Sequence, residues 1–275
     1  MFKVFALADS LKKYGAVLHV LALEGKASNH QHSAIEFYYL NQIEDTTGLA
    51  LINKYKYQKD KLRWALKPVF LKYLLNKNDS VIYIDNDIYF YEDCAFLFHQ
   101  LIQHNVLLTP HFYQANPLKS QNWLEANFRV GLYNAGFVGV NNQAVSFLDW
   151  WAQCCLYNLK KSFWRGLFDD QKYLDLAPIL FDKVQIVKHQ GCNIAGWNYK
   201  NINESVVFIH FAELTLIEFA KENNPYFPAY LKYMNSLRDY APNYVFKRKI
   251  FNFFTINSYL YFVKWNVYRF FEKLF

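Results

Sequence analysis

The stretch that decides the fold of this chain is Val81-Ile82-Tyr83-Ile84-Asp85-Asn86-Asp87-Ile88-Tyr89-Phe90. Strand-forming residues run into two carboxylates one residue apart, and an apolar run resumes behind them. Inside a strand, two such carboxylates would lose water and repel each other. We therefore expect the strand to end at Asp85, with a divalent cation between Asp85 and Asp87. Such a site suits a substrate that carries its own negative charge, above all a diphosphate.

The composition is that of a folded protein. Of the 275 residues, 53% are hydrophobic and 20% aromatic, which excludes disorder. This length fits one α/β domain with a C-terminal appendage as well as it fits two domains. The 22 Tyr and 26 Phe suit sugar faces and membrane interfaces, or simply a bulky core.

The net charge of +7 is concentrated near the C-terminus. Residues 243–275 hold one anion, Glu272, and six cations: Lys247, Arg248, Lys249, Lys264, Arg269 and Lys273. The rest of the chain is close to neutral, so nucleic-acid binding is not expected. Cations interleaved with aromatic residues suit helices lying on an anionic membrane surface, or a terminal helix packed on the domain. The uncharged run 250–263 is too short to span a membrane.

Cysteine usage and the start of the chain indicate the compartment. The four cysteines form no CxxC pair: Cys94, Cys154, Cys155 and Cys192. Met1 leads straight into an amphipathic pattern, without the features of a signal peptide. These observations predict reduced thiols and a cytoplasmic protein.

Hydrophobic spacing predicts alternating helices and strands. The expected helices are 2–14, 61–75, 96–104, 145–159 and 169–176, and the expected strands are 16–23, 81–85, 106–109, 138–140, 184–187 and 206–211. Residues 29–58 read as polar and irregular. Alternation of this kind implies a mainly parallel sheet wrapped by helices. Ligands of such sheets lie beyond the carboxyl ends of the strands, where Asp85 and Asp87 are placed.

The two acids are the first candidate site. Because side chains alternate along a strand, Asp85 and Asp87 point the same way and can hold Mn²⁺ or Mg²⁺. The alternative is a loop of solvated acids. His210 ends the apolar run 206–211 and is either a core histidine or a further metal ligand, since imidazole suits Mn²⁺ better than Mg²⁺.

Three other segments offer polar groups, each with a plain structural alternative. Asp170 and Gln171 begin a predicted helix, and they either cap it or face sugar hydroxyls. Lys67, a turn from Arg63, lies on a solvated helix face or clamps a diphosphate. Residues 191–198, which include Asn193 and Trp197, form a tight connection or a loop that closes over a leaving phosphate.

Taken in order, these pieces resemble one family. The motifs are Trp64-Ala-Leu-Lys-Pro68, Val81-Ile-Tyr-Ile-Asp-Asn-Asp87, Leu108-Thr-Pro-His111, Tyr133-Asn-Ala-Gly136, Asp170-Gln171, Gly191-Cys-Asn193 with Trp197, and Phe208-Ile-His-Phe211. They look like nucleotide-diphospho-sugar glycosyltransferases of the GT-A fold, with glycogenin and the lipopolysaccharide galactosyltransferases as relatives. A bacterial branch of that family carries the Trp-Ala-Leu-Lys-Pro signature. The likeness covers residues 2–212, so the expected domains are 1–212 and a helical region at 213–275.

The resemblance implies a role for each matching position. Asp85 and Asp87 match the acids that bind Mn²⁺ and the donor diphosphate, and His210 matches the histidine that completes the metal shell. The positions implied to bind the donor are Lys67, Asp85, Asn134, Gly136, Asn193 and Trp197. Asp170 matches a carboxylate that grips sugar hydroxyls, and Gln171 a polar group beneath the anomeric carbon.

Two departures from the family pattern stand out. Family members begin with a strand that cradles the nucleotide base, and the helix expected at 2–14 follows it, so this strand is expected to be missing here. After the late His-Phe, the chain carries Ala212-Glu213 where relatives carry Ser or Gly with Gly. The second change is expected to leave less room for a backbone contact to phosphate.

The resemblance implies a metal-dependent glycosyltransferase. Its donor would be a UDP-sugar and its acceptor a glycan or glycolipid in surface polysaccharide or lipopolysaccharide synthesis. Transfer would retain the anomeric configuration, on the cytoplasmic face of the membrane. The main alternative is an inactive homologue that binds a glycan or a partner protein. A metal-dependent phosphohydrolase is a third interpretation, but it would need more metal-binding residues near Asp85.

Overall fold

The computed structural model describes residues 1–24, 32–162, 165–246 and 267. The chain forms two compact units, Met1–Tyr244 and Val245–Phe275. Nearly all of the second unit lies outside the described residues, and so does the expectation of membrane-surface helices there. The division falls after Tyr244 and not at residue 212, because α9 and α10 belong to the first unit. Within the described residues, no helix is both long and apolar enough to cross a membrane.

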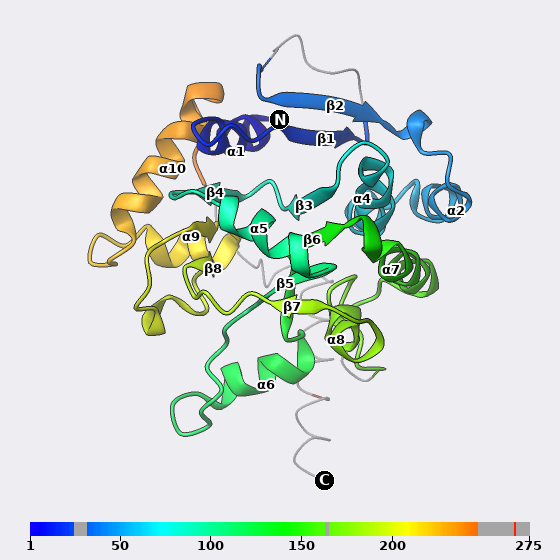
Figure 1. The fold of residues 1–275 in the computed structure, drawn as a ribbon. Helices are drawn as coiled ribbons and strands as arrows, with labels where there is room; N and C mark the ends of the chain where they lie inside the picture. Colours follow the sequence, from blue (N-terminus) through cyan, green and yellow to red (C-terminus); the bar gives the residue numbers. More distant parts are fainter. Residues whose placement is uncertain (25–31, 163–164, 247–266, 268–275) are drawn as a thin grey trace. The chain divides into compact units, whose positions relative to one another are not determined.

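Helices and strands alternate along the first unit (Figure 1). The α-helices are α1 (Phe2–Lys12), α2 (Thr46–Tyr55), α3 (Lys59–Ala65), α4 (Lys67–Leu75), α5 (Ala95–Gln103), α6 (Gln121–Arg129), α7 (Val145–Tyr157), α8 (Ala177–Leu180), α9 (Glu213–Phe219) and α10 (Phe227–Tyr240). The strands are β1 (Leu18–Ala22), β2 (Ile35–Tyr39), β3 (Ser80–Ile84), β4 (Ile88–Phe90), β5 (Val106–Pro110), β6 (Tyr133–Asn141), β7 (Val184–Ile186), β8 (Cys192–Ile194) and β9 (Phe208–His210). Short 3₁₀ helices span Leu40–Gln42, Asn142–Ala144, Lys172–Leu176 and Tyr199–Asn201.

The strands form three sheets with the orders β1-β2, β3-β6-β5-β7 and β4-β9-β8. The pairs β1/β2, β5/β7 and β8/β9 are parallel, whereas β3/β6, β5/β6 and β4/β9 are antiparallel. The α/β architecture expected from the sequence is confirmed, but the pairing is mixed and not mainly parallel. β6 is the long central strand, buried along all but its last residue, and it joins the edge strand β3 to β5.

Two apolar cores cover the two faces of the central sheet. Val81 of β3 belongs to the core formed with α2, α3, α4 and α7. Its neighbours Ile82 and Ile84 pack against the other core, which includes residues of α1 and α5. This alternation follows from the period of two in a strand. It places apolar side chains of β3 on both faces of the sheet, of which only Val81 is buried, and the charged residues come where β3 ends, at Asp85.

A hollow of about 1310 Å³ separates β1 from β3. Leu18–Ala22 of β1 and residues 80–84 of β3 line it, together with Leu7 of α1 and Phe70 of α4. In the part of the chain that the structure describes, β1 pairs only with β2, and β3 only with β6. The edges of both strands that face the hollow are therefore without a strand partner there. The hollow extends to Asp85 and Asp87.

Several elements differ from the sequence prediction. Residues 29–58 are not irregular throughout, because β2 and α2 lie within them, and Asp45 Oδ1 caps α2 by accepting from Gly48 N at 2.9 Å. In the helical segment predicted over 61–75, Pro68 is expected either to kink the helix or to open its main part; it lies in the first turn of α4 and so begins a new helix after Leu66. The helix predicted from Asp169 begins as a turn, with φ of 51° at Asp169, and continues as 3₁₀.

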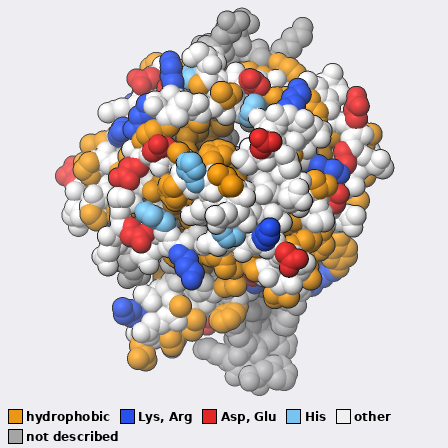
Figure 2. All heavy atoms as spheres, in the orientation of Figure 1, with side chains coloured by type: hydrophobic (Ala, Val, Ile, Leu, Met, Phe, Trp, Pro, Cys, Tyr) orange, Lys and Arg blue, Asp and Glu red, His pale blue; other side chains and the backbone are white. Residues whose placement is uncertain are grey.

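Helix α10 belongs to the body of the first unit. Tyr233 stacks on Phe211 with ring centroids 4.0 Å apart, and Tyr240 donates to Asp9 of α1 at 2.6 Å. On the face drawn in Figure 2, Lys and Arg side chains are interspersed with Asp and Glu side chains. A mixed surface of this kind agrees with the near-neutral charge of the chain before residue 243.

Candidate active site

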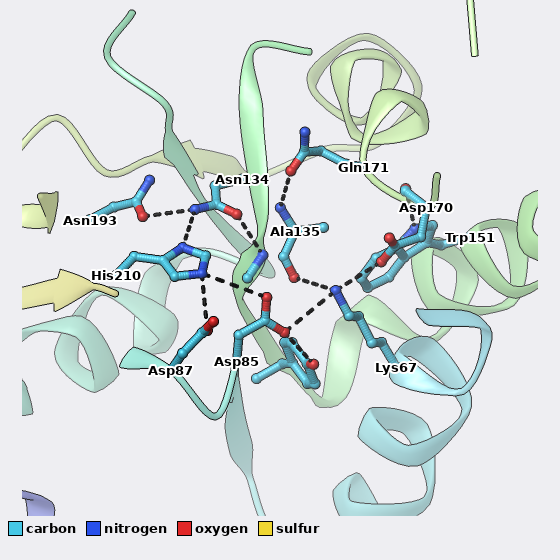
Figure 3. Close-up of polar contacts among 12 residues, drawn as sticks. Lys67, Asp85, Asp87, Asn134, Ala135, Trp151, Asp170, Gln171, Asn193 and His210 are labelled. Carbon is cyan, nitrogen blue, oxygen red and sulfur yellow. Dashed lines mark hydrogen bonds and ion pairs between the residues drawn. The ribbon is translucent and has the colours of Figure 1, made fainter. Parts of the chain in front are cut away.

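Three side chains of types that can bind a metal ion meet where β3, β4 and β9 come together. Asp85 follows β3, Asp87 precedes β4, and His210 ends β9, which pairs with β4 so that Ile88 lies opposite His210. One ligand atom from each of the three lies within 4.8 Å of the others. His210 Nε2 is 3.1 Å from Asp87 Oδ1 and 4.0 Å from Asp85 Oδ2 (Figure 3). The pairing of β4 with β9 thus brings together residues that are 123 positions apart in the sequence.

Amide side chains hold the other edge of the His210 ring. Asn134 Nδ2 lies 2.9 Å from His210 Nδ1 and donates to Asn193 Oδ1 at 2.7 Å (Figure 3). Asn193, at a φ of 71°, donates in turn to the carbonyl of Pro110 at 3.0 Å. The network leaves Nε2 facing the acids, which is the arrangement that a metal-binding histidine needs.

Gly136 provides the space that these groups occupy. A Cβ atom at this position would lie 2.9 Å from both Asp85 Oδ2 and His210 Cε1, and 3.0 Å from Asn134 Oδ1. Any larger side chain would displace the acid or the imidazole. The requirement for glycine here is therefore steric, and it comes from the side chains of the cluster.

Burial and charge act against each other at the acids and the imidazole. Burial opposes ionisation of Asp87, but His210 and Lys3 outweigh it, so the pKa of Asp87 lies below its usual value. Burial likewise opposes protonation of His210, but Asp87 and then Asp85 raise the pKa of the imidazole. The acids therefore attract positive charge to this point, and a divalent cation would satisfy both of them.

Lys67 is the buried cation of the site. Its side chain is 4% exposed, and Nζ lies 3.0 Å from Asp170 Oδ2 and 3.7 Å from Asp85 Oδ1 (Figure 3). Nζ also donates to the carbonyl of Ala135 at 3.0 Å. Burial would lower the pKa of Lys67, but Asp170 and Asp85 raise it, so the ammonium group stays charged. Lys67 thus links the metal-ligating cluster to Asp170.

Asp170 and Gln171 lie on the other side of Lys67. Burial raises the pKa of Asp170 to about 6 against the opposing effect of Lys67, and Asp170 Oδ2 meets Lys67 as an ion pair without a well-aligned hydrogen bond. The Asp170 carbonyl accepts from Trp151 Nε1 at 2.9 Å, which fixes the turn. Gln171 accepts from Ala135 N at 3.4 Å and donates to the carbonyl of Val130 at 3.2 Å.

All ten residues singled out in the sequence lie in one connected network. Lys67, Asp85, Asp87, Asn134, Gly136, Asp170, Gln171, Asn193 and His210 are joined by the contacts above. Trp197 meets His210 edge-on, with ring centroids 5.8 Å apart.

Sequence reasoning missed three neighbours of the site. Tyr83 donates to Asp85 Oδ1 at 2.6 Å, and the period of two along β3 could have placed it beside Asp85. Lys3 of α1 lies 3.8 Å from Asp87 Oδ2, a contact between elements that carries no local sequence signal. His111 stands out in the sequence only as part of a motif, yet its buried ring lies beside that of Trp197, with ring centroids 5.8 Å apart.

Comparison of the structure with solved structures identifies the fold. The galactosyltransferase LgtC, solved with donor and acceptor sugar analogs, superposes with a TM-score of 0.50 at 13% identity, over 86% of this chain and 91% of LgtC. The fold is that of the GT-A glycosyltransferases. Mouse xyloside xylosyltransferase 1 superposes with a TM-score of 0.48 at 13% identity, over 78% of this chain and 92% of that one.

Comparisons of the sequence with known proteins add relatives but no activity. No family model matches this GT-A chain. Over 141 residues it is 33% identical to the uncharacterized protein YfnF of Bacillus subtilis (strain 168), which covers 50% of this chain and 46% of YfnF. Over 242 residues it is 28% identical to YfnD of the same organism, covering 79% of this chain and 75% of YfnD. The chain therefore matches about half the length of YfnF.

The donor set fits a divalent metal. Two carboxylates and one imidazole are ligands that Mn²⁺ accepts, and Mg²⁺ would be served mainly by the carboxylates. The hydrogen bonds to Asp85 from Tyr83 and between His210 and Asn134 orient the ligands from behind. In the GT-A fold described here, Asp85, Asp87 and His210 are thus the residues that would hold such an ion.

Proposed function

We propose that this chain is a metal-dependent glycosyltransferase that moves a sugar from a nucleotide diphosphate sugar to a hydroxyl group of a glycan or lipid-linked acceptor. The observation that carries the proposal is the cluster of Asp85, Asp87 and His210, which lies at the end of β3 beside the buried pair Lys67–Asp170. The GT-A fold agrees with it. When bound, Mn²⁺ or Mg²⁺ would neutralise the diphosphate and so stabilise the leaving nucleotide.

The protein's own side chains would position the donor sugar and stabilise the charge that develops on it. Lys67 holds Asp170 in place and adds a positive charge beside Asp85. As the bond to the leaving group breaks, positive charge grows on the sugar ring, and the Asp170 carboxylate with the Gln171 amide would stabilise it. Asn134, Gly136, Asn193 and Trp197 would line the donor sugar pocket, since they surround His210.

The finer features of the proposal rest on the family resemblance. We propose a UDP-sugar donor, a hexosyl group, and transfer that retains the anomeric configuration. The acceptor is proposed to be a glycan or glycolipid of surface polysaccharide or lipopolysaccharide. The hexosyl assignment is supported by the fold shared with LgtC, which is a galactosyltransferase.

We also propose that the protein works in the cytoplasm, on the inner face of the cell membrane. The support is compositional, because residues 243–275 carry six cations among many aromatic side chains. Such a segment is attracted to anionic lipid by about 1 kcal/mol per basic residue near the surface.

Donor hydrolysis tests the proposal. UDP-glucose and UDP-galactose are incubated with the full chain and Mn²⁺, and the release of UDP is followed. Hydrolysis by the wild type and almost none by Asp87→Ala is the expected result. The matched control, Asp239→Ala, removes an exposed acid on α10 and should hydrolyse the donor normally.

Metal binding is measured alongside donor hydrolysis. Mn²⁺ at about 100 times its Kd should stabilise the wild type by about 2.7 kcal/mol, and should not stabilise Asp87→Ala. Equal donor hydrolysis by the wild type and Asp87→Ala would contradict a role for the two acids in the reaction. Metal binding without any donor hydrolysis would instead favour an inactive GT-A homologue that binds a glycan or a partner protein.

A further inference from the structure

A row of aromatic rings leads away from the proposed catalytic centre. It begins at Trp197, which contacts the edge of His210, and continues to His111 and Tyr113, with ring centroids 5.8 and 6.2 Å from that of Trp197. Tyr113 lies between two nearly parallel rings, His111 at 4.6 Å and Trp123 of α6 at 5.3 Å. The row thus connects the metal-ligating cluster to helix α6.

The row is built into the fold. Trp197 Nε1 and Asn198 Nδ2 both donate to the carbonyl of His111 at 2.9 Å. His111 N donates to the carbonyl of Leu132 at 3.0 Å, and Ser120 caps α6 by accepting from Trp123 N at 3.3 Å. Trp197, His111 and Trp123 are therefore held by hydrogen bonds, and Tyr113 is held by stacking between His111 and Trp123.

The outer rings of the row are not core residues. Tyr113, Trp123 and Trp197 are only half-buried, and no residue of α6 is buried. Large aromatic side chains that only pack a core would be covered on all sides. Part of each of these rings remains exposed, which is the arrangement found where aromatic side chains contact a ligand.

His111 adds a fixed hydrogen-bonding group at the inner end. Its Nδ1 lies 3.1 Å from the carbonyl of Gly131, which can only accept, so Nδ1 carries the proton. Burial, and then the neighbouring charge of His210, lower the pKa of His111 to about 3, so the ring is neutral. Nε2 is then an acceptor.

The row of aromatic rings and the hollow between β1 and β3 border the proposed catalytic centre at different residues. The hollow between β1 and β3 is lined by Lys67, Asp85 and Asp87, and none of the four aromatic residues of the row lines it. A donor that binds between the acids and the hollow would reach the row only at its innermost ring, Trp197, and would leave His111, Tyr113 and Trp123 free. The second substrate would then approach along the row, and the sugar to be transferred would lie between the two near Gln171.

We propose that His111, Tyr113 and Trp123 form the acceptor subsite together with Trp197, the ring that also borders the donor sugar pocket, and that the acceptor presents a pyranose ring to it. The inference rests on the proposed function and deepens it. The C–H face of a pyranose packs on the exposed surface of Trp123 and Trp197, and hydroxyl groups at its rim are bonded by polar groups near Gln171. The acceptor is therefore a glycan whose terminal sugar is recognised by stacking on aromatic rings.

Ligand-observed saturation-transfer NMR on the full chain tests the subsite. The probes are the methyl pyranosides of glucose, galactose and mannose, each at millimolar concentration. At least one should receive saturation at its C–H protons from the wild type. Trp123→Ala should weaken that binding about three- to tenfold, and Trp123→Phe should retain most of it.

Folding and site specificity are controlled on the same helix. Because α6 has no buried residue, Trp123→Ala should keep the wild-type circular dichroism spectrum. Phe128→Ala removes another aromatic side chain of α6, one that is 69% exposed, and should bind the probe like the wild type. Equal saturation in wild type and Trp123→Ala, or no saturation with any of the three probes, would overturn the subsite.

Donor hydrolysis by the wild type, measured in parallel with UDP-sugar and Mn²⁺, separates the two proposals. Hydrolysis without Trp123-dependent pyranoside binding would overturn the acceptor subsite and leave the glycosyltransferase proposal standing. Trp123-dependent binding without hydrolysis would overturn the glycosyltransferase proposal and leave a glycan-binding surface.

Discussion

Replacing Lys67 by methionine tests the centre of the site most directly. The change keeps an unbranched side chain of similar length but removes the buried ammonium group. Asp170, which is 2% exposed, loses its partner at 3.0 Å, and Asp85 loses a cation at 3.7 Å. The hydrogen bond to the carbonyl of Ala135 is lost as well.

The magnitude follows from these distances. At an effective dielectric constant near 20, a unit charge pair at 3.0 Å attracts with about 5.5 kcal/mol, and one at 3.7 Å with about 4.5 kcal/mol. The second value is reduced by solvent, because the Asp85 side chain is one-third exposed. Burying the ammonium group opposes the attraction by several kcal/mol. We therefore expect Lys67→Met to lower the free energy of unfolding by about 3–5 kcal/mol at pH 7.

Urea unfolding followed by circular dichroism between about pH 5 and 8 measures the effect. The folded pKa of Asp170 is raised to about 6, above the ordinary value of 3.8. A carboxyl group shifted in this direction contributes stability at low pH that is lost as the pH rises through the folded pKa. Without Lys67 this pKa rises further, so the deficit of Lys67→Met should be smallest near pH 5 and largest near pH 8.

Two comparisons make the result decisive. The control Lys72→Met changes another lysine of α4 that also pairs with two acids, Asp45 and Asp149. Because Lys72 is one-third exposed, this change should lower the free energy of unfolding by only about 1 kcal/mol or less. Adding Asp170→Asn to Lys67→Met should restore about 2 kcal/mol, because no buried carboxylate is left unpaired. A loss below about 1 kcal/mol with no dependence on pH would refute the buried ion pair.

Three further outcomes are expected. Sugar transfer should fall as the pH drops through about 6, where Asp170 takes up a proton, and a flat pH profile of kcat between about pH 5 and 7 would contradict its role as a carboxylate. Gly136→Ala should weaken Mn²⁺ binding in calorimetry by about tenfold or more, whereas Gly139→Ala, whose Cβ would meet Leu107 at 3.1 Å, should change stability and leave metal affinity intact. Removing the chain beyond residue 242 should abolish co-sedimentation with phosphatidylserine vesicles at low salt, and retained binding would count against membrane attachment by that segment.

The residues of the site could be predicted from the sequence because several of them lie in short motifs. Asp85 and Asp87 follow an apolar run, and two carboxylates at the end of a buried strand need a partner wherever the strand lies. Asn134 and Gly136 likewise belong to one short motif, in which Gly136 N donates to Asn134 Oδ1, and Asp170 and Gln171 are neighbours in the sequence. Their order along the chain pointed to the GT-A fold, which the structural comparison confirms.

Contacts between elements that are distant in the sequence could not be predicted from such short motifs. The pairing of Lys67 with Asp170 joins α4 to a turn 103 residues later; the motif at 64–68 singled out Lys67, but no local pattern named Asp170 as its partner. Tyr113 and Trp123 look like any aromatic residues in a polar stretch, and only the stacking of rings from a loop and α6 makes them a surface. The missed β2 and α2 lie in a polar segment whose apolar residues are covered by other elements.

By itself, the sequence determined where charge ends a buried strand, which residues supply carboxylates, amides and imidazole, and that helices and strands alternate. These properties depend on side-chain type and on the short periods of helix and strand. The tertiary structure decided which of these groups meet: His210 beside Asp87, Lys67 beside Asp170, and the aromatic row beside His210. These contacts depend on the pairing of β4 with β9 and of β3 with β6. Such long-range strand pairing is set by the packing of the apolar cores on both faces of the sheet.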